Sequence, residues 1–279
     1  MNIIYVDNYK EDEQKILLSL GVKCFRFSKD DMIKGNVFDT ILGSTTYQVR
    51  SNKISSADYA AIAEEMAKHG ISLTTSVMSF DILNDAKKQY DILKEFCPKS
   101  IIVDKTFSTE TIMRLVEENQ FTYPIFARTD VESAAKYVGV GGCTIPQKRI
   151  EEFERVLSGI SENVKGYRQI ILKEVVTIQK DPKTGSDLEF RAIGCGGNLY
   201  IFDFNIDEFS ISPLELGLDV FARKALQKLA ERGADGGIFV DVAVLEDGSK
   251  TVIECKNLLN GTIRSVQEFG IAALEHNEA

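Results

Sequence analysis

Two carboxylates near the end of the chain have a spacing that suits metal binding. Asp241 and Glu254 lie on opposite sides of residues 246–249, a turn-forming segment that predicts a hairpin of two antiparallel strands. Because side chains alternate along a strand, both carboxylates can project from one face of the pair. Two carboxylates so placed suit a hard, oxygen-binding cation such as Mg²⁺. The alternative is an amphipathic hairpin with solvent-facing carboxylates, although the apolar neighbours of both residues indicate buried strands.

A second candidate site combines two cations with a glycine-containing segment. Arg128 ends an apolar run at 124–128, and Lys136 and segment 139–142, which holds three glycines, follow it. Backbone N–H groups and two cations at such a place can converge on phosphates. The segment is not a Walker A loop, because GxxxxGK followed by Ser or Thr occurs nowhere in the chain. A surface loop with two solvated cations is the alternative.

Two further strand-like runs carry charged residues that can face a pocket. Lys173 and Glu174 interrupt the β-branched run 169–178, and neighbours on a strand face opposite ways, so only one of them can face a given pocket. A cation there can bind a phosphate. Glu189 and Arg191 share a strand face, where a guanidinium can hold a phosphate or a carboxylate with two hydrogen bonds. Structural charge pairs are the alternative for both runs.

The first hundred or so residues alternate strand-like runs with helical patterns, which predicts a small α/β layer with parallel strands. A helical pattern that ends at Cys97-Pro98 marks the expected domain boundary, with one domain at 1–98 and another at 99–279. The expected strands of the first domain are 3–6, 23–27 and 38–42, and its expected helices are 11–20, 57–69 and 80–96.

Beyond residue 98 the strand-like runs tend to come in pairs joined by turn signals, as antiparallel sheets require. The segments 196–198 and 246–249 are the turns of the last two pairs. The expected strands are 100–103, 124–128, 169–178, 188–195, 199–204, 237–245 and 250–255, and the expected helices are 108–119, 146–160 and 213–232.

The composition bounds the function. The chain has 279 residues, 44% of them hydrophobic, which is enough for two packed units. A net charge of -9 lacks the basic footprint of a nucleic-acid-binding protein. No run approaches the roughly 20 apolar residues of a bilayer span, and the N-terminus carries no secretion signal, so we expect a cytoplasmic protein without a membrane partner. Five scattered cysteines and two histidines argue against a zinc site or a disulfide framework.

The order of the charged elements resembles a known family. The order is similar to that of the ATP-grasp fold. It runs from a strand with a terminal cation through a glycine-containing loop, a helix, a Lys-Glu strand, a Glu-x-Arg strand and a second helix to an Asp strand and a Glu strand. Arg128, Lys136 and Lys173 resemble the one arginine and two lysines of a clade that is frequent in phage and bacterial mobile elements. The resemblance covers roughly residues 98–265. It implies a small pre-ATP-grasp-like α/β domain, followed by antiparallel sheets in two α+β subdomains at about 99–172 and 173–279.

The resemblance also implies roles in ATP binding. Arg128 and Lys136 would contact the phosphates of ATP, and Lys173 with Glu174 would lie on the adenine side near the hinge between the subdomains. Glu189 would bind the nucleotide as part of the Glu-x-Arg strand. The candidate catalytic cations are then Arg128, Lys136 and Arg191.

Mg²⁺ would be held by Asp241, Glu254 and Asn257, but the chain departs from the family here. The family usually ends its metal strand with Glu-x-Asn, whereas Lys256 stands at that position and Asn257 follows one place later. Either a local bulge lets Asn257 or Asn260 serve, or Lys256 replaces the ligand and weakens the second metal site.

The reaction that the resemblance implies is an ATP- and Mg²⁺-dependent ligation through an acylphosphate. A substrate carboxylate, from a small molecule, a peptide or a protein tail, would attack the γ-phosphoryl group of ATP, and an amine or a thiol would then capture the acylphosphate. Charge stabilisation is the main catalytic need, so a site without histidine is sufficient. The resemblance leaves open whether the chain forms a homodimer.

Two other hypotheses use the same residues. Asp241, Glu254 and Lys256 resemble the Asp…Glu-x-Lys core of restriction-like nucleases, in which the carboxylates bind Mg²⁺ and the lysine assists attack by water. Against that reading, the nuclease core needs a further helix and strand, whereas only about twenty residues follow the lysine, and residues 269–276 read as helix with no closing strand. The third hypothesis is a catalytically reduced ATP-binding module that acts as an interaction protein.

Overall fold

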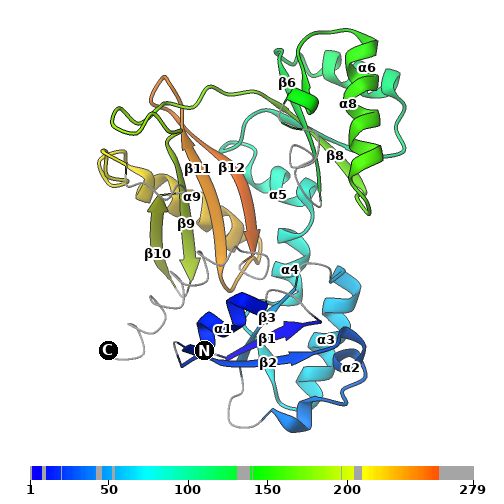
Figure 1. The fold of residues 1–279 in the computed structure, drawn as a ribbon, viewed down its shortest axis with the longest axis vertical. Helices are drawn as coiled ribbons and strands as arrows, with labels where there is room; N and C mark the ends of the chain where they lie inside the picture. Colours follow the sequence, from blue (N-terminus) through cyan, green and yellow to red (C-terminus); the bar gives the residue numbers. More distant parts are fainter. Residues whose placement is uncertain are drawn as a thin grey trace.

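The computed structural model describes residues 2–7, 11–19, 21–41, 46–51, 54–130, 139, 141–195, 197–203 and 209–257. Within these ranges the chain forms three four-stranded sheets with their own helices (Figure 1). The first sheet lies at the bottom of the view, the second at the upper right and the third at the left. Among the described helices, none combines the length and the apolar character that crossing a bilayer requires.

The first sheet is parallel, as the alternating pattern predicts, with the strand order β2-β1-β3-β4. Buried side chains such as Ile4, Tyr47 and Tyr59 form the core between this sheet and its helices. The strands are β1 (Asn2–Val6), β2 (Lys23–Phe27), β3 (Thr46–Arg50) and β4 (Ser72–Leu73), and the helices are α1 (Glu11–Ser19), α2 (Lys29–Ile33) and α3 (Ser56–Lys68).

The expected strand at 38–42 is wrong. Phe38–Thr40 forms a short 3-10 helix, η1, and the strand of this part of the chain is β3. The sequence pattern hides β3 because two of its polar side chains, Gln48 and Arg50, are buried and interrupt the apolar run that marks a buried strand.

The helix expected at 80–96 is two helices, α4 (Val77–Leu83) and α5 (Ala86–Leu93). The Asp85 carboxylate accepts hydrogen bonds from the backbone N–H groups of Lys87 and Lys88, and so caps the N-terminus of α5. Leu83 and Leu93 from these helices enter the core of the third sheet. The two helices therefore connect the first sheet to the third.

The second sheet is antiparallel, with the order β5-β8-β6-β7. Two helices cover one of its faces, where Ile112 and Phe153 pack against Leu172. Its other face carries Arg128 and Lys173. The strands are β5 (Ser100–Asp104), β6 (Ile125–Thr129), β7 (Thr144–Ile145) and β8 (Gln169–Glu174), and the helices are α6 (Thr109–Glu118) and α8 (Ile150–Asn163).

The third sheet is antiparallel, with the order β10-β9-β11-β12, and its two hairpins confirm the strand pairs predicted from the turns. Helix α9 (Leu218–Glu231) packs on one face together with α5. On the other face, Ile193 and Phe239 contact the core that Tyr5 of the first sheet enters. The strands are β9 (Glu189–Cys195), β10 (Asn198–Asp203), β11 (Ile238–Val244) and β12 (Lys250–Asn257).

Candidate functional site

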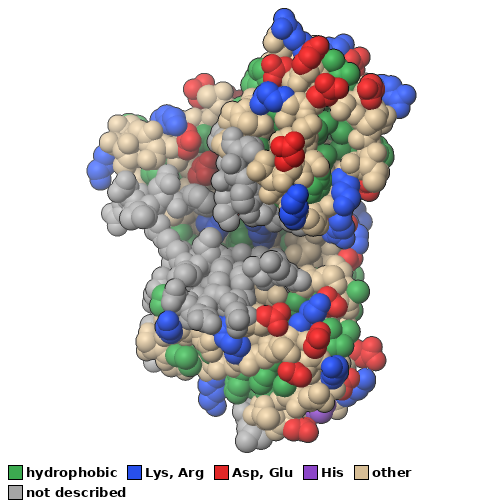
Figure 2. Space-filling model, turned by 45° about the vertical axis from the view of Figure 1, so that its right-hand side comes forward, with side chains coloured by type: hydrophobic (Ala, Val, Ile, Leu, Met, Phe, Trp, Pro, Cys, Tyr) green, Lys and Arg blue, Asp and Glu red, His purple; other side chains and the backbone are tan. Residues whose placement is uncertain are grey.

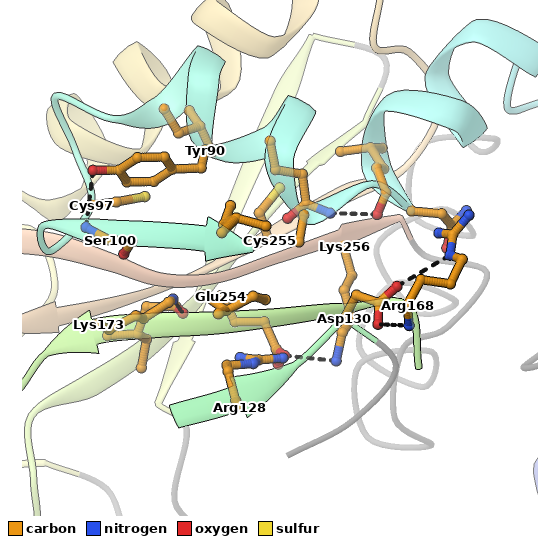
Figure 3. Close-up of a pocket in the computed structure, with 18 of the residues that line it drawn as sticks. Tyr90, Cys97, Ser100, Arg128, Asp130, Arg168, Lys173, Glu254, Cys255 and Lys256 are labelled. Carbon is orange, nitrogen blue, oxygen red and sulfur yellow. Dashed lines mark hydrogen bonds and ion pairs between the residues drawn. The ribbon is translucent and has the colours of Figure 1, made fainter. Parts of the chain in front are cut away.

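A cavity of about 720 Å³ lies between the edge strand β12, the open face of the second sheet and the helices α4 and α5 (Figure 3). Among the described residues its lining includes five basic side chains and two acidic ones, although the whole chain has a net charge of -9. A hollow with basic side chains around it is visible in the middle of the molecule (Figure 2). The cavity is thus a local basic site, which suits an anionic ligand. The basic residues are Arg128, Lys165, Arg168, Lys173 and Lys256.

Glu254 on β12 is held by two of these cations. Its Oε1 accepts hydrogen bonds from Arg128 Nη2 at 2.9 Å and from Lys256 Nζ at 2.7 Å. Burial alone would raise the pKa of Glu254, but Lys256 and Arg128 lower it to about 2, so the carboxylate is ionised at neutral pH. Arg128 Nε is buried and has no hydrogen-bond partner in the described part of the chain. A bound anion would satisfy this donor.

Lys173 on β8 reaches across to β12. Its Nζ donates to the carbonyl oxygen of Ile253 at 3.1 Å. Ile253 is the extra residue of a β-bulge, because the β11–β12 register shifts between Asp241 and Val242 and leaves it without a partner on β11. Burial, with Arg128 nearby, lowers the pKa of Lys173 to about 8. We call Arg128, Lys173, Glu254 and Lys256 the cation cluster.

Next to the cation cluster, Arg191 and Asp241 form a bidentate ion pair. Arg191 Nε and Nη2 donate to Asp241 Oδ1 and Oδ2, each at 2.7 Å, and both side chains are buried. Burial raises the pKa of Asp241, and Arg191 opposes this rise. Glu189 lies two residues before Arg191 on the same strand face, and its pKa is raised by burial and by nearby Asp187 and Asp241. The register pairs Asp241 directly with Glu254, so the two carboxylates share a face, as their spacing predicts.

Glu174, one of the expected nucleotide ligands, lies outside the cavity and contacts Thr122 and Lys99. Its Oε1 accepts a hydrogen bond from the backbone N–H of Thr122 at 2.7 Å and lies 3.7 Å from Lys99 Nζ. Of Lys173 and Glu174, only Lys173 therefore lines the cavity. Lys136 lies outside the described residues.

Asn257 is not brought to the two carboxylates. From Glu254 to Asn257 the pairing with β11 is regular, so alternation puts Lys256 on the face of Glu254 and Asn257 on the opposite face. The bulge at Ile253 comes before Glu254 and leaves this alternation unchanged. The Asn257 amide is fully buried, and neither its nitrogen nor its oxygen has a hydrogen-bond partner within the described ranges.

The described residues hold no cluster of three or more His, Cys, Asp or Glu side chains that suits a metal. For Mg²⁺ they offer two hard carboxylate donors on one face, Asp241 and Glu254, a donor set that suits one such ion.

The sequence pattern missed part of the cavity wall. Asp130, just after β6, accepts hydrogen bonds from the backbone N–H groups of Arg168 and Gln169, and its Oδ2 lies 3.3 Å from Arg168 Nε. Tyr90 on α5 accepts a hydrogen bond from the backbone N–H of Ser100. The only signal for Asp130 was its position at the carboxyl end of a strand that also delivers Arg128.

Neither a protein-family model nor a curated protein matches the chain. Several solved structures resemble it. A D-alanine–D-alanine ligase from Bacillus anthracis complexed with ATP is similar over 97% of this chain and 92% of its own, with a TM-score of 0.61 and 16% identity. A D-cycloserine synthetase matches 96% of this chain and 94% of its own, with a TM-score of 0.60 and 13% identity.

A third similar structure is a carboxyaminoimidazole ribonucleotide synthase from Aspergillus clavatus complexed with ATP. It covers 91% of this chain and 69% of its own, with a TM-score of 0.59 and 11% identity. The chain has the ATP-grasp fold. The predicted fold class is confirmed, including the α/β sheet and the antiparallel sheets. In this ATP-grasp fold, the cation cluster lies where the second and third sheets face each other across the cavity.

Proposed function

We propose that the chain binds ATP at the cation cluster and uses it to activate a substrate carboxylate for ligation to an amine or a thiol. The observation that carries this proposal is that Arg128 and Lys256 bind Glu254 while Lys173 binds the neighbouring Ile253 carbonyl, within an ATP-grasp fold. Arg128 and Lys173 come from the second sheet and Glu254 and Lys256 from the third, so a bound triphosphate would contact both.

The charge of the cluster supports the proposal. Three cations surround one carboxylate, so the cluster carries an excess of positive charge in a buried setting. Buried cations stabilise a triphosphate, and the charge that moves during phosphoryl transfer, more strongly than exposed ones do. The buried Nε of Arg128 is a donor that the protein itself leaves unused in the described ranges. A phosphate oxygen would accept from it.

Asp241 and Glu254 would hold Mg²⁺. The ion supplies charge neutralisation on the phosphates when it is bound. Arg191 holds Asp241 in a fixed orientation through two hydrogen bonds, so this carboxylate is in place before any ligand arrives. Glu189, on the same strand face, is the proposed further contact to the nucleotide.

The proposed reaction needs no nucleophile from the protein. An oxygen of the substrate carboxylate attacks the γ-phosphorus of ATP, and ADP leaves with the electrons of the broken bond. The amine or thiol then attacks the acyl carbon of the acylphosphate, and phosphate leaves. The residues of the cluster orient the triphosphate and stabilise the charge that develops on it.

Arg128 and Lys173 also support the assignment to the clade with one arginine and two lysines, in which Lys136 would be the third cation. The substrate carboxylate belongs to a small molecule, a peptide or a protein tail. The similar solved structures include a D-alanine–D-alanine ligase and a D-cycloserine synthetase, and amino acids are therefore the first substrates to test. The expected location is the cytoplasm.

One observation favours the nuclease hypothesis locally. Asp241, Glu254 and Lys256 share a face of the third sheet, as that hypothesis requires. The fold argues against it, because this sheet is a purely antiparallel part of an ATP-grasp fold. DNA nicking is therefore an outcome that the experiment must be able to detect.

Calorimetric titration with a non-hydrolysable ATP analogue and Mg²⁺ tests the proposal. Arg128→Met should abolish binding, whereas Arg114→Met should not, because Arg114 is exposed on α6. Phosphate release from ATP with a panel of amino acids then distinguishes a ligase from a reduced binding module. Metal-dependent nicking of DNA by the wild type without ATP, together with no nucleotide binding, would reject the proposal.

A further inference from the structure

The lysine that interrupts the expected metal-binding motif points to an unusual metal requirement. We propose that the Lys256 ammonium takes the place of a second divalent cation, so that the chain binds ATP with a single Mg²⁺. This inference rests on the proposed ATP binding and concerns which positive charges, ammonium or metal, lie at the same site.

Lys256 lies on the same face of β12 as Glu254 and contacts it directly. Lys256 lies two residues after Glu254 on a regularly paired part of β12, so the two side chains share a face. Its Nζ lies 2.7 Å from Glu254 Oε1 and lines the cavity. A positive charge is therefore already in direct contact with the carboxylate that would hold metal.

The contacts of Glu254 limit how its carboxylate can bind metal. A carboxylate commonly bridges two metal ions by offering one oxygen to each of them. Glu254 Oε1 already accepts from both Arg128 Nη2 and Lys256 Nζ, which uses both of its lone pairs. The Oε2 atom remains for metal, and a bridge that uses both carboxylate oxygens is blocked while Arg128 and Lys256 keep these contacts.

No third side chain of the described residues joins Asp241 and Glu254 in a metal-binding group. Asn257 points to the opposite face of β12, and the residues that the structure describes contain no cluster of three metal-ligating side chains. Asp241 and Glu254, with phosphate oxygens and water, complete one octahedral Mg²⁺ site. A second ion would lie roughly 3.5–4 Å from the first, as in two-metal sites, and would compete with the ammonium for the same space.

Electron paramagnetic resonance with Mn²⁺ in place of Mg²⁺ tests the inference. Nucleotide binding is first measured by calorimetry, and Mn²⁺ is then titrated into the complex of the full chain with the non-hydrolysable ATP analogue. The wild type should bind one Mn²⁺ per bound nucleotide and give no spectrum of a coupled Mn²⁺ pair. Lys256→Asn restores Glu-x-Asn and should bind two Mn²⁺ ions with a coupled spectrum. Lys183→Asn, at an exposed turn, should behave like the wild type.

The outcomes separate this inference from the proposed function. Two coupled Mn²⁺ ions in the wild type would overturn the inference and leave ATP binding intact. A wild type that binds no nucleotide would reject the proposed function and the inference with it. The wild-type stoichiometry decides the matter without any variant, so a failure of Lys256→Asn to fold does not affect the test.

Discussion

Replacing Glu254 with glutamine removes the one negative charge among the cations that join the second and third sheets. Glutamine keeps the shape of a protonated glutamate, so the change isolates the charge. The folded pKa of Glu254 is about 2, against an ordinary value of 4.5. This difference corresponds to about 3 kcal/mol of folding free energy at neutral pH. We expect Glu254→Gln to lower the free energy of unfolding by about that amount at pH 7.

The sign of the pH dependence follows from the lowered pKa. The charge of Glu254 contributes fully above its unfolded pKa of about 4.5, and the contribution is lost as the pH falls through the folded pKa of about 2. The difference between the wild type and Glu254→Gln should therefore shrink from about 3 kcal/mol at pH 7 to about 1.5 kcal/mol at pH 3.

Urea denaturation measures this difference. The chain contains no tryptophan, so far-UV circular dichroism is the appropriate signal. Glu64→Gln is the control, because the Glu64 side chain is 76% exposed. Its unfolding free energy should stay within about 0.5 kcal/mol of the wild type. An equal stability of Glu254→Gln and the wild type at pH 7, or a difference that does not change with pH, would refute the reasoning.

Three further predictions concern single residues of the site and the fold. Burial lowers the pKa of Lys173 to about 8, so the affinity of the wild type for the ATP analogue, measured by calorimetry, should be constant below pH 8 and fall above it. Lys173→Arg should show no such fall. A fall in the wild type and in Lys173→Arg alike would contradict the role of Lys173 in phosphate binding. Asp241→Ala leaves the buried Arg191 guanidinium without its carboxylate and should cost about 3–5 kcal/mol in urea, while a loss below 1 kcal/mol would contradict the ion pair's importance. Asp85→Ala removes the cap of α5 and should lower the free energy of unfolding by about 1 kcal/mol in thermal unfolding, whereas Asp85→Asn should keep most of the wild-type stability.

The antiparallel sheets were predictable because their signals are local. Turn residues between two strand-like runs fix a hairpin, and alternation within each run then places Asp241 opposite Glu254. The strand β3 was not predictable in this way, since the burial of Gln48 and Arg50 depends on the packing of the whole domain. The break between α4 and α5 had a local signal, the cap at Asp85, that the long apolar periodicity concealed.

The site was predictable only in part, because its contacts join distant segments. Arg128 lies 126 residues before Glu254, and the order of family-like elements was the only sequence feature that connected them. The contact between Lys173 and the Ile253 carbonyl lies at a bulge that has no signature in the sequence. Asp130 and Arg168, 38 residues apart, meet through the pairing of β6 with β8 and belong to no motif.

A crystal structure of the complex with a non-hydrolysable ATP analogue and Mg²⁺ tests the central claim most directly. Phosphate oxygens should lie within hydrogen-bond distance of Arg128 and Lys173, with the metal on Asp241 and Glu254. A nucleotide bound elsewhere, or triphosphate oxygens that touch neither Arg128 nor Lys173, would contradict the account.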